Sequence, residues 1–375
     1  MNPSVSIIMP VFNAKEHLSK TITSILSQDF ESFELIIVND GSTDGSLAIC
    51  KEFADKDARV KIINQKNSGT SAARNTGLNV AKGKYITFCD HDDEYLPHLL
   101  RDNFELAEKK QVDVLQFSIN RIDTTRQNQI ISQRLNDYSI DSGDIRNKYL
   151  DIRLTENFMD VWNHFYLRSS IQHIRFNAIY RHGREDLDFN LNVLKQIKKG
   201  YLFSSNIYYN HYFYKNSSSN SFSPKITKEI EKEYNTLFQI EYEFLMFFQS
   251  NKFFSTSKAT QILIHNLDFL HSKVEFQSVS ELKGFYKSPL FSHIPFRLPL
   301  KIKLYLWAFF NSSIIFKFLN FLSPLQSIST APKFENTTLY GFFLDLFNSP
   351  KGRFIFNFCN FTIKFLTLPF RLKNP

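Results

Sequence analysis

Residues 85–93 read YITFCDHDD, a short apolar run of strand-forming residues followed at once by a cluster of acids. The run Tyr85 to Cys89 is typical of a strand buried inside a sheet. Asp90, Asp92 and Asp93 then put three carboxylates within four residues, where like charges repel one another. A divalent cation with a phosphate ligand would relieve that repulsion, because hard cations take oxygen ligands. A charged loop that caps the next helix is the alternative, and these residues alone do not separate the two.

The same kind of strand recurs on either side of this stretch and alternates with helical patterns. Strands are expected at 5–9, 33–38, 60–63, 84–89 and 112–117. The segments between them have helical spacing, including a run of small residues at 70–81. This alternation predicts an α/β fold with a mostly parallel, doubly wound sheet. Ligands bind beyond the carboxyl ends of the strands in such sheets, which is where the acidic cluster would lie.

Local signals predict how the first two helices begin. Pro10 should end the first strand, and Asn13 with Glu16 three residues later forms a capping-box pattern. Asp44 is interpreted as the cap of the second helix. In the turn before it, Asp40 closes a strand between residues that favour a tight turn. A carboxylate at that position can accept a hydrogen bond from a nucleobase or a ribose.

Two further clusters carry charged residues that could act in chemistry. Arg74 lies in the small-residue helix and would point to the ligand side of the sheet, although a lone arginine on a helix is usually a solvated charge. Glu185 and Asp186 precede an amphipathic helix. They could be only a favourable charge at its N-terminus, or they could supply a general base.

Together these motifs resemble the inverting glycosyltransferases of family 2, which have the GT-A fold, a Rossmann-like α/β architecture. The resemblance covers about residues 3–222 and rests on five motifs in order: PVFN at 10–13, the turn at 38–44, ARNTG at 73–77, DHDD at 90–93 and ED at 185–186. Residues 161–163 and 174–176 also resemble the acceptor half of bacterial members that build surface polysaccharide or lipooligosaccharide.

The resemblance implies roles for individual residues. Nucleotide binding is implied for six positions: Pro10, Val11, Phe12, Asp40, Arg74 and Asp90. Asp90 and Asp92 match the acids that hold a divalent cation, Mn²⁺ or Mg²⁺, with Asp92 the direct ligand. Asp186 matches the catalytic base, and Glu185 precedes it.

The function implied by the resemblance is transfer of a hexosyl or related sugar from a nucleotide sugar, expected to be a UDP sugar, to a hydroxyl of a glycan or lipid-linked acceptor in surface polysaccharide biosynthesis. The Gln-x-x-Arg-Trp motif of processive polymer synthases is absent, which favours single additions. Two departures concern histidine: His91 fills a position often taken by a small residue, and His211 with Lys215 follows the last core strand, where relatives often carry Arg or His.

Two other functions compete with this interpretation. A sugar nucleotidyltransferase would need a glycine-rich, basic loop after the first strand, and residues 10–14 read PVFNA. A catalytically inactive carbohydrate-binding or scaffold protein would not need the acids, all of which are present. No nucleic-acid partner is expected.

The composition excludes several classes of protein. With 43% hydrophobic and 22% charged residues, the chain of 375 residues can bury a sizeable core and is not intrinsically disordered. Three widely spaced cysteines exclude a disulfide scaffold and offer no zinc-site spacing, which fits a reducing compartment. The 45 Lys and Arg against 37 Asp and Glu give a net charge of +8, which favours anionic partners.

The chain is expected to divide into a GT-A domain, 1–222, and a helical, Phe-rich, basic region, 223–375. Within the domain, 1–95 would form the nucleotide-binding half and 96–222 the acceptor half. Five serines and a proline at 215–225 predict a linker, and 227–248 a helix.

The C-terminal tail suggests attachment to an anionic membrane surface. On a helix, polar positions of residues 354–371 would form one narrow stripe, and the tail has no acid after Asp345. Basic residues beside an apolar face favour anionic lipid, whereas docking on the protein's own core is the alternative.

Secretion and membrane spanning are not expected. The start of the chain lacks a basic region before its apolar run, and no uncharged apolar stretch reaches about 18 residues. The predicted location is therefore cytoplasmic and peripheral, at the inner face of the cytoplasmic membrane.

Overall fold

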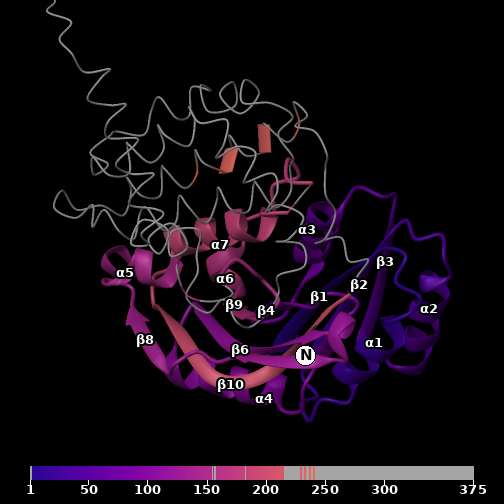
Figure 1. The fold of residues 1–375 in the computed structure, drawn as a ribbon, viewed down its shortest axis with the longest axis horizontal. Helices are drawn as coiled ribbons and strands as arrows, with labels where there is room; N and C mark the ends of the chain where they lie inside the picture. Colours follow the sequence, from indigo (N-terminus) through magenta and orange to yellow (C-terminus); the bar gives the residue numbers. More distant parts are fainter. Residues whose placement is uncertain are drawn as a thin grey trace, which may run out of the picture.

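The structure is a computed structural model that describes residues 2–153, 155, 158–181 and 183–214, together with 229, 232, 233, 236, 237 and 240 (Figure 1). Those last six residues are helical, within the helix expected at 227–248. The expected linker at 215–225, the rest of that helix and the tail lie outside the described residues. In the described part, no helix is long and apolar enough to cross a membrane.

One sheet of ten strands organises the described chain (Figure 1). The strands are β1 Val5–Val11, β2 Phe33–Asp40, β3 Val60–Gln65, β4 Tyr85–Phe88, β5 Glu94–Tyr95, β6 Val114–Asp123, β7 Gln129–Gln133, β8 Tyr138–Asp141, β9 His164–Leu167 and β10 Gly200–Phe213. Their order is β3-β2-β1-β4-β9-β6-β10-β5, with β7 paired to β6 and β8 paired to β10.

The predicted parallel arrangement is confirmed for the N-terminal half of the sheet. Strand β1 lies parallel to both β2 and β4, and β3 lies parallel to β2. Strand β9 then lies between β4 and β6 and runs antiparallel to both. Four residues are too few to give a readable alternation, which is why this strand was not expected from the sequence. The fold class, a mixed α/β fold with parallel strands at its centre, is as predicted.

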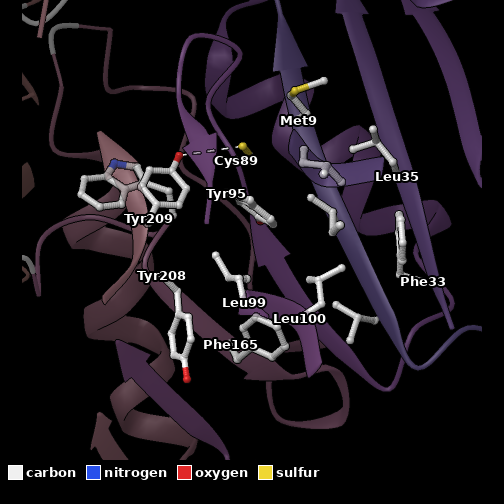
Figure 2. Packing of buried hydrophobic residues seen from close by; sticks show 14 of the residues in the cluster. Met9, Phe33, Leu35, Cys89, Tyr95, Leu99, Leu100, Phe165, Tyr208 and Tyr209 are labelled. Carbon is white, nitrogen blue, oxygen red and sulfur yellow. Dashed lines mark hydrogen bonds between the residues drawn. The ribbon is translucent and has the colours of Figure 1, made fainter. Parts of the chain in front are cut away.

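Helices cover both faces of the sheet. They are α1 Leu18–Leu26, α2 Ser46–Lys56, α3 Thr70–Val80, α4 Leu99–Lys110, α5 Ile145–Arg153, α6 Arg168–Ile171 and α7 Glu185–Gln196. Figure 1 shows α3 and α7 on one side of the sheet and α4 on the other. Ile7 and Met9 of β1 pack into the core shared with α1 and α4 (Figure 2), whereas Ile8 packs into the core shared with α3 and α7. The alternation of a strand therefore fills two cores at once.

Helix α3 packs closely against β1, as its small residues predict. A Cβ atom placed on Gly77 would lie 2.4 Å from the Cγ2 atom of Ile8, which is closer than atoms can approach. Arg74 is one turn before Gly77 on this helix. The close packing of α3 on β1 therefore fixes the position of Arg74 relative to the sheet.

The prediction that Pro10 ends the first strand is wrong. Strand β1 continues through Pro10 to Val11. Pairing between β1 and β4 stops at Ile8, whose carbonyl accepts a hydrogen bond from the Cys89 amide at 3.1 Å. The backbone groups of residues 8 and 10 both point toward β4. Because β4 has already ended at the level of Pro10, the N–H that proline lacks has no partner to lose there.

The predicted capping box is also wrong, whereas Asp44 does satisfy the start of its helix. Helix α1 begins at Leu18, and Asn13 instead has a left-handed backbone and accepts a hydrogen bond from the Thr43 amide at 2.8 Å. Asp44 accepts from the Ser46 amide at 3.0 Å, although Gly45 is the residue at the cap position. Tertiary contacts with the neighbouring turn outweighed the local capping pattern.

A buried histidine in β9 makes the stability of the fold sensitive to pH. His164 is 1% exposed and bonds through Nε2 to the Tyr201 hydroxyl at 2.8 Å. Burial lowers its pKa from 6.5 to about 3, because a charged ring there would lose its hydration. The folded protein therefore binds no proton at His164 between pH 6.5 and 3, whereas the unfolded chain does.

We expect the free energy of unfolding to fall as the pH is lowered from 7.5 to 5.5, with His164 contributing a loss of about 1.4 kcal/mol. The His164→Gln variant should lack this contribution, because glutamine has no titrating group. Urea unfolding of both proteins at the two pH values measures it. Equal pH dependence in the two proteins would contradict the assignment.

Candidate active site

The ends of the parallel strands bring the predicted site residues to one edge of the sheet. Phe12 directly follows β1, Asp40 ends β2, and Asp90 comes two residues after the end of β4. Adjacent parallel strands end at the same edge, so these residues from three separate motifs lie on the same side of the molecule. Arg74 on α3 and Asp186 on α7 reach this edge from one face.

Arg74 joins three of the predicted acids in one buried cluster. Its guanidinium nitrogen Nη1 lies 2.6 Å from Asp186 Oδ1 and 3.4 Å from Glu185 Oε1. Its other terminal nitrogen, Nη2, lies 3.0 Å from Asp90 Oδ1. The Arg74 side chain is only 3% exposed. The ED motif at 185–186 therefore meets the acidic cluster at 90–93 through a single arginine, Arg74 of the ARNTG motif.

The pKa values of Arg74 and Asp186 depend on burial and on the opposite charges within this cluster. Burial by itself would lower the pKa of Arg74, but the carboxylates of Asp186, Asp90 and Glu185 raise it above its ordinary value. Burial also raises the pKa of Asp186 well above its ordinary value, and Arg74 opposes that shift. The Asp186 side chain keeps 15% of its surface exposed. A carboxylate with a raised pKa is a stronger base than an ordinary aspartate, and the exposed part of its side chain leaves an approach for a proton donor.

Asp40 is held by the loop that leads into α3. Its Oδ1 atom accepts hydrogen bonds from the Gln65 amide group at 2.7 Å and from the Ser68 backbone N–H at 2.9 Å. Its Oδ2 atom accepts from the Gly69 backbone N–H at 2.8 Å. A carboxylate can accept about four hydrogen bonds, so these three leave one acceptor position on a side chain that is 3% exposed.

The three residues predicted beside the nucleotide differ in exposure. Pro10 and Val11 are buried in β1, so they contribute backbone and packing rather than side-chain surface. Phe12 is 45% exposed at the end of the strand. It offers an aromatic surface directly after Val11, which pairs with Asn39, the residue before Asp40.

Within the acidic cluster, Asp93 is an anchor of the fold. Its side chain is completely buried and accepts hydrogen bonds from the Tyr209 hydroxyl at 2.7 Å, His211 Nδ1 at 3.0 Å and the Tyr212 backbone N–H at 2.9 Å. Figure 2 shows Tyr209 pointing from β10 toward Cys89, the residue before the cluster. Asp93 thus ties the loop after β4 to β10.

His211 and Trp162 complete this anchor. The Trp162 ring stacks nearly parallel on His211 at 4.8 Å and on Tyr209 at 4.9 Å between ring centres. Burial alone would lower the pKa of His211, but the neighbouring Asp93 carboxylate raises it. Tyr209 was not singled out from the sequence; its only signal is that it lies on the same face of β10 as His211, two residues away.

Asp92 is the acid of the cluster that remains available. It is half-buried and has no hydrogen bond or ion pair with the described residues. Burial raises its pKa to about 6, and the negative charge of Asp93 adds to the shift. Such a carboxylate gains from a nearby cation.

The residues fit a divalent cation in part. Asp92 is unpartnered, and only one oxygen of Asp90 is taken, by Arg74. Among the described residues, however, no three His, Cys, Asp or Glu side chains form a ready-made metal site. Two carboxylate ligands with the remaining positions filled by water and phosphate oxygens suit Mg²⁺ or Mn²⁺ better than a closed all-protein cage.

Comparison with known proteins agrees with this arrangement. The family model described as glycosyl transferase family 2 matches residues 6–175. An uncharacterized glycosyltransferase of Haemophilus influenzae is 38% identical over 205 residues, which span 54% of this chain and 76% of the relative. EpsJ, an uncharacterized glycosyltransferase of Bacillus subtilis, is 28% identical over 237 residues, which span 62% of this chain and 68% of EpsJ.

The fold matches solved structures as well. The crystal structure of S. aureus TarS 1–349 in complex with UDP aligns with a TM-score of 0.61 at 16% identity, covering 86% of this chain and 92% of that one. The same protein in complex with UDP-GlcNAc aligns with a TM-score of 0.57. The solved structures show the fold, and the family model with the 38% identical relative shows that this chain is an enzyme of glycosyl transferase family 2.

Proposed function

We propose that the enzyme transfers a sugar from a nucleotide-sugar donor, with UDP as the expected nucleotide, to a hydroxyl group of a glycan or lipid-linked acceptor, with inversion and with a divalent cation. The observation that carries the proposal is the placement of two sets of acids at one edge of the sheet. Asp90 and Asp92 follow β4, and Asp186 approaches on a separate helix, so metal binding and proton transfer fall to different carboxylates.

The nucleobase would lie between Phe12 and Asp40. Phe12 offers an exposed aromatic surface for a flat ring, and Asp40 has one acceptor position left for a donor N–H on that ring. The two TarS structures in complex with UDP and UDP-GlcNAc support a uridine nucleotide in this fold. The prediction that Arg74 contacts the nucleotide stays a prediction, because its described partners are carboxylates.

The diphosphate is the leaving group, and its departure develops negative charge. Asp92, with Asp90, would hold the Mn²⁺ or Mg²⁺ ion, which when bound neutralises that charge. The acids themselves could not do so, since they carry the same sign as the phosphates. Asp90 and Asp92 would therefore bind the donor diphosphate only together with the cation.

Asp186 would act as the general base. Its carboxylate takes the proton of the acceptor hydroxyl as that oxygen forms a bond to the anomeric carbon, while the bond from this carbon to the diphosphate oxygen breaks and the nucleoside diphosphate leaves with the electron pair. Attack from the face opposite the leaving group inverts the anomeric centre. Glu185 lies beside the base and shares Arg74 with it.

The expected pathway is biosynthesis of a surface polysaccharide, by single additions. Support comes from one relative, the minor teichoic acid biosynthesis protein GgaB of Bacillus subtilis, which is 28% identical over 56% of this chain and 23% of its own length. The absence of the Gln-x-x-Arg-Trp motif supports single additions rather than processive synthesis.

A screen of nucleotide sugars tests this function directly. We expect one of them, with manganese present, to raise the temperature of thermal unfolding and to be hydrolysed slowly without acceptor. Chelation of the metal should remove both effects. Neither binding nor hydrolysis with any nucleotide sugar would contradict the proposal.

We also propose that the enzyme attaches peripherally to anionic membrane through its tail, which lies outside the described residues. Each basic residue near such a surface contributes about 1 kcal/mol. Changing five of them, Lys351, Arg353, Lys364, Arg371 and Lys373, to glutamine should therefore abolish flotation of the full chain with anionic liposomes at low salt. Neutral liposomes are the control. Equal flotation of both proteins, or none of the wild type, would mean that the tail serves another purpose.

A further inference from the structure

We propose that Arg74 is a positioning residue that sets the distance between the catalytic base and the metal-binding loop. This inference rests on the proposed function and deepens it. Nη1 of Arg74 bonds to Asp186 on α7, and Nη2 bonds to Asp90 in the loop after β4. A guanidinium is planar and rigid, so carboxylates bound to its two terminal nitrogens are held at a spacing set by covalent geometry.

The arginine is itself held in one conformation. The aromatic ring of Phe176 lies 5.3 Å from the centre of its guanidinium group and stacks in parallel on Phe189 of α7 at 4.2 Å. Asn75, the neighbour of Arg74, fixes the backbone of Phe176 with two hydrogen bonds of 2.8 Å, one donated and one accepted. Helix α3, the segment around residue 176 and α7 are therefore joined around the guanidinium.

This arrangement argues against a direct contact between Arg74 and the diphosphate. Both terminal nitrogens bond to carboxylates, and Nε is buried without a hydrogen-bond partner among the described residues. A phosphate at the guanidinium would lie beside the carboxylates of Asp186, Glu185 and Asp90, and repulsion between like charges makes such a contact costly in a buried site. The arrangement is instead suited to hold two acids of different roles at a fixed spacing, because a misplacement of about 1 Å can lower the rate about 100-fold.

Replacing Arg74 by lysine tests the proposal, because lysine keeps the charge and loses the planar fork. In the full chain, we expect kcat for transfer to fall about 10- to 100-fold, while the affinity for UDP with manganese changes less than about threefold. Arg59→Lys is the matched control: Arg59 also forms a paired contact with a carboxylate, Asp57, at the opposite edge of the sheet. That variant should keep wild-type kcat.

A second variant keeps the test decisive if Arg74→Lys fails to fold. Asn75→Ala removes both hydrogen bonds to Phe176 without touching an ion pair, and should lower kcat in the same direction by a smaller factor, again with UDP affinity retained. Unchanged kcat in a folded Arg74→Lys, or in Asn75→Ala where the lysine variant does not fold, overturns the proposal. So does a loss of UDP affinity with kcat retained, since that result makes Arg74 a nucleotide ligand. If the wild type turns over but Asp186→Asn does too, the base assignment fails separately.

Discussion

Asp186→Asn is expected to lower the rate of sugar transfer by about 10²- to 10⁴-fold while leaving donor binding almost unchanged. Asparagine has the same shape as aspartate and can still accept a hydrogen bond from Arg74, but it cannot take the proton of the attacking hydroxyl. The measurement is kcat with saturating donor and acceptor, alongside calorimetry with UDP and manganese. The predicted result is a loss confined to kcat.

Asp188→Asn is the matched control for this experiment. Asp188 is the third acid in the first turn of α7, is 2% exposed, and has a pKa raised by burial to about 6. Its side chain accepts a hydrogen bond from Asn192, not from the Arg74 cluster. This variant should keep most of the transfer activity. Near-normal transfer by Asp186→Asn, or an equal loss in both variants, would falsify the assignment of the base.

The same base predicts the acid limb of the pH profile. Because burial raises the pKa of Asp186, its carboxylate is protonated at a higher pH than an ordinary aspartate. The active form is deprotonated, so transfer should decline as the pH falls through that raised pKa.

Asp92→Ala is expected to weaken manganese-dependent binding of UDP by more than about 100-fold. Loss of a group that only supports a metal ligand costs 10- to 100-fold in metal affinity, and loss of a direct ligand should cost no less. Asp92 is half-buried and has no partner among the described residues, so the substitution would remove the proposed metal ligand and break no hydrogen bond there. Calorimetry with UDP, with and without manganese, measures the effect.

Asp55→Ala provides the control, since Asp55 is an exposed acid on α2. It should bind UDP and manganese like the wild type. Wild-type binding should also weaken as the pH falls through about 6, because a protonated carboxyl cannot ligate the metal. An Asp92→Ala protein that bound UDP with unchanged, metal-dependent affinity would move the metal site to other residues.

The elements of residues 1–95 could be predicted from the sequence because they depend on near neighbours. Runs of apolar residues located β1 to β4, and small residues located α3 and its close approach to Ile8. Acids that follow strands in a parallel sheet must share an edge, so the meeting of Asp40 with Asp90 at one edge also follows from the pattern. In the described half of the chain, these inferences needed no long-range information.

The roles within that edge were decided by tertiary structure. Asp90, Asp92 and Asp93 are equivalent in the sequence, yet one bonds to Arg74, one stays unpartnered and one is buried against β10. The same holds for Arg74, which was expected on the ligand side of the sheet, with a solvated charge as the alternative. Its partners lie 16 and 112 positions away in the sequence. The periodicity of nearby residues shows which face of a helix or strand a residue occupies. The partner of a buried charge is set by the order of the strands, which decides which distant helix or loop lies beside it.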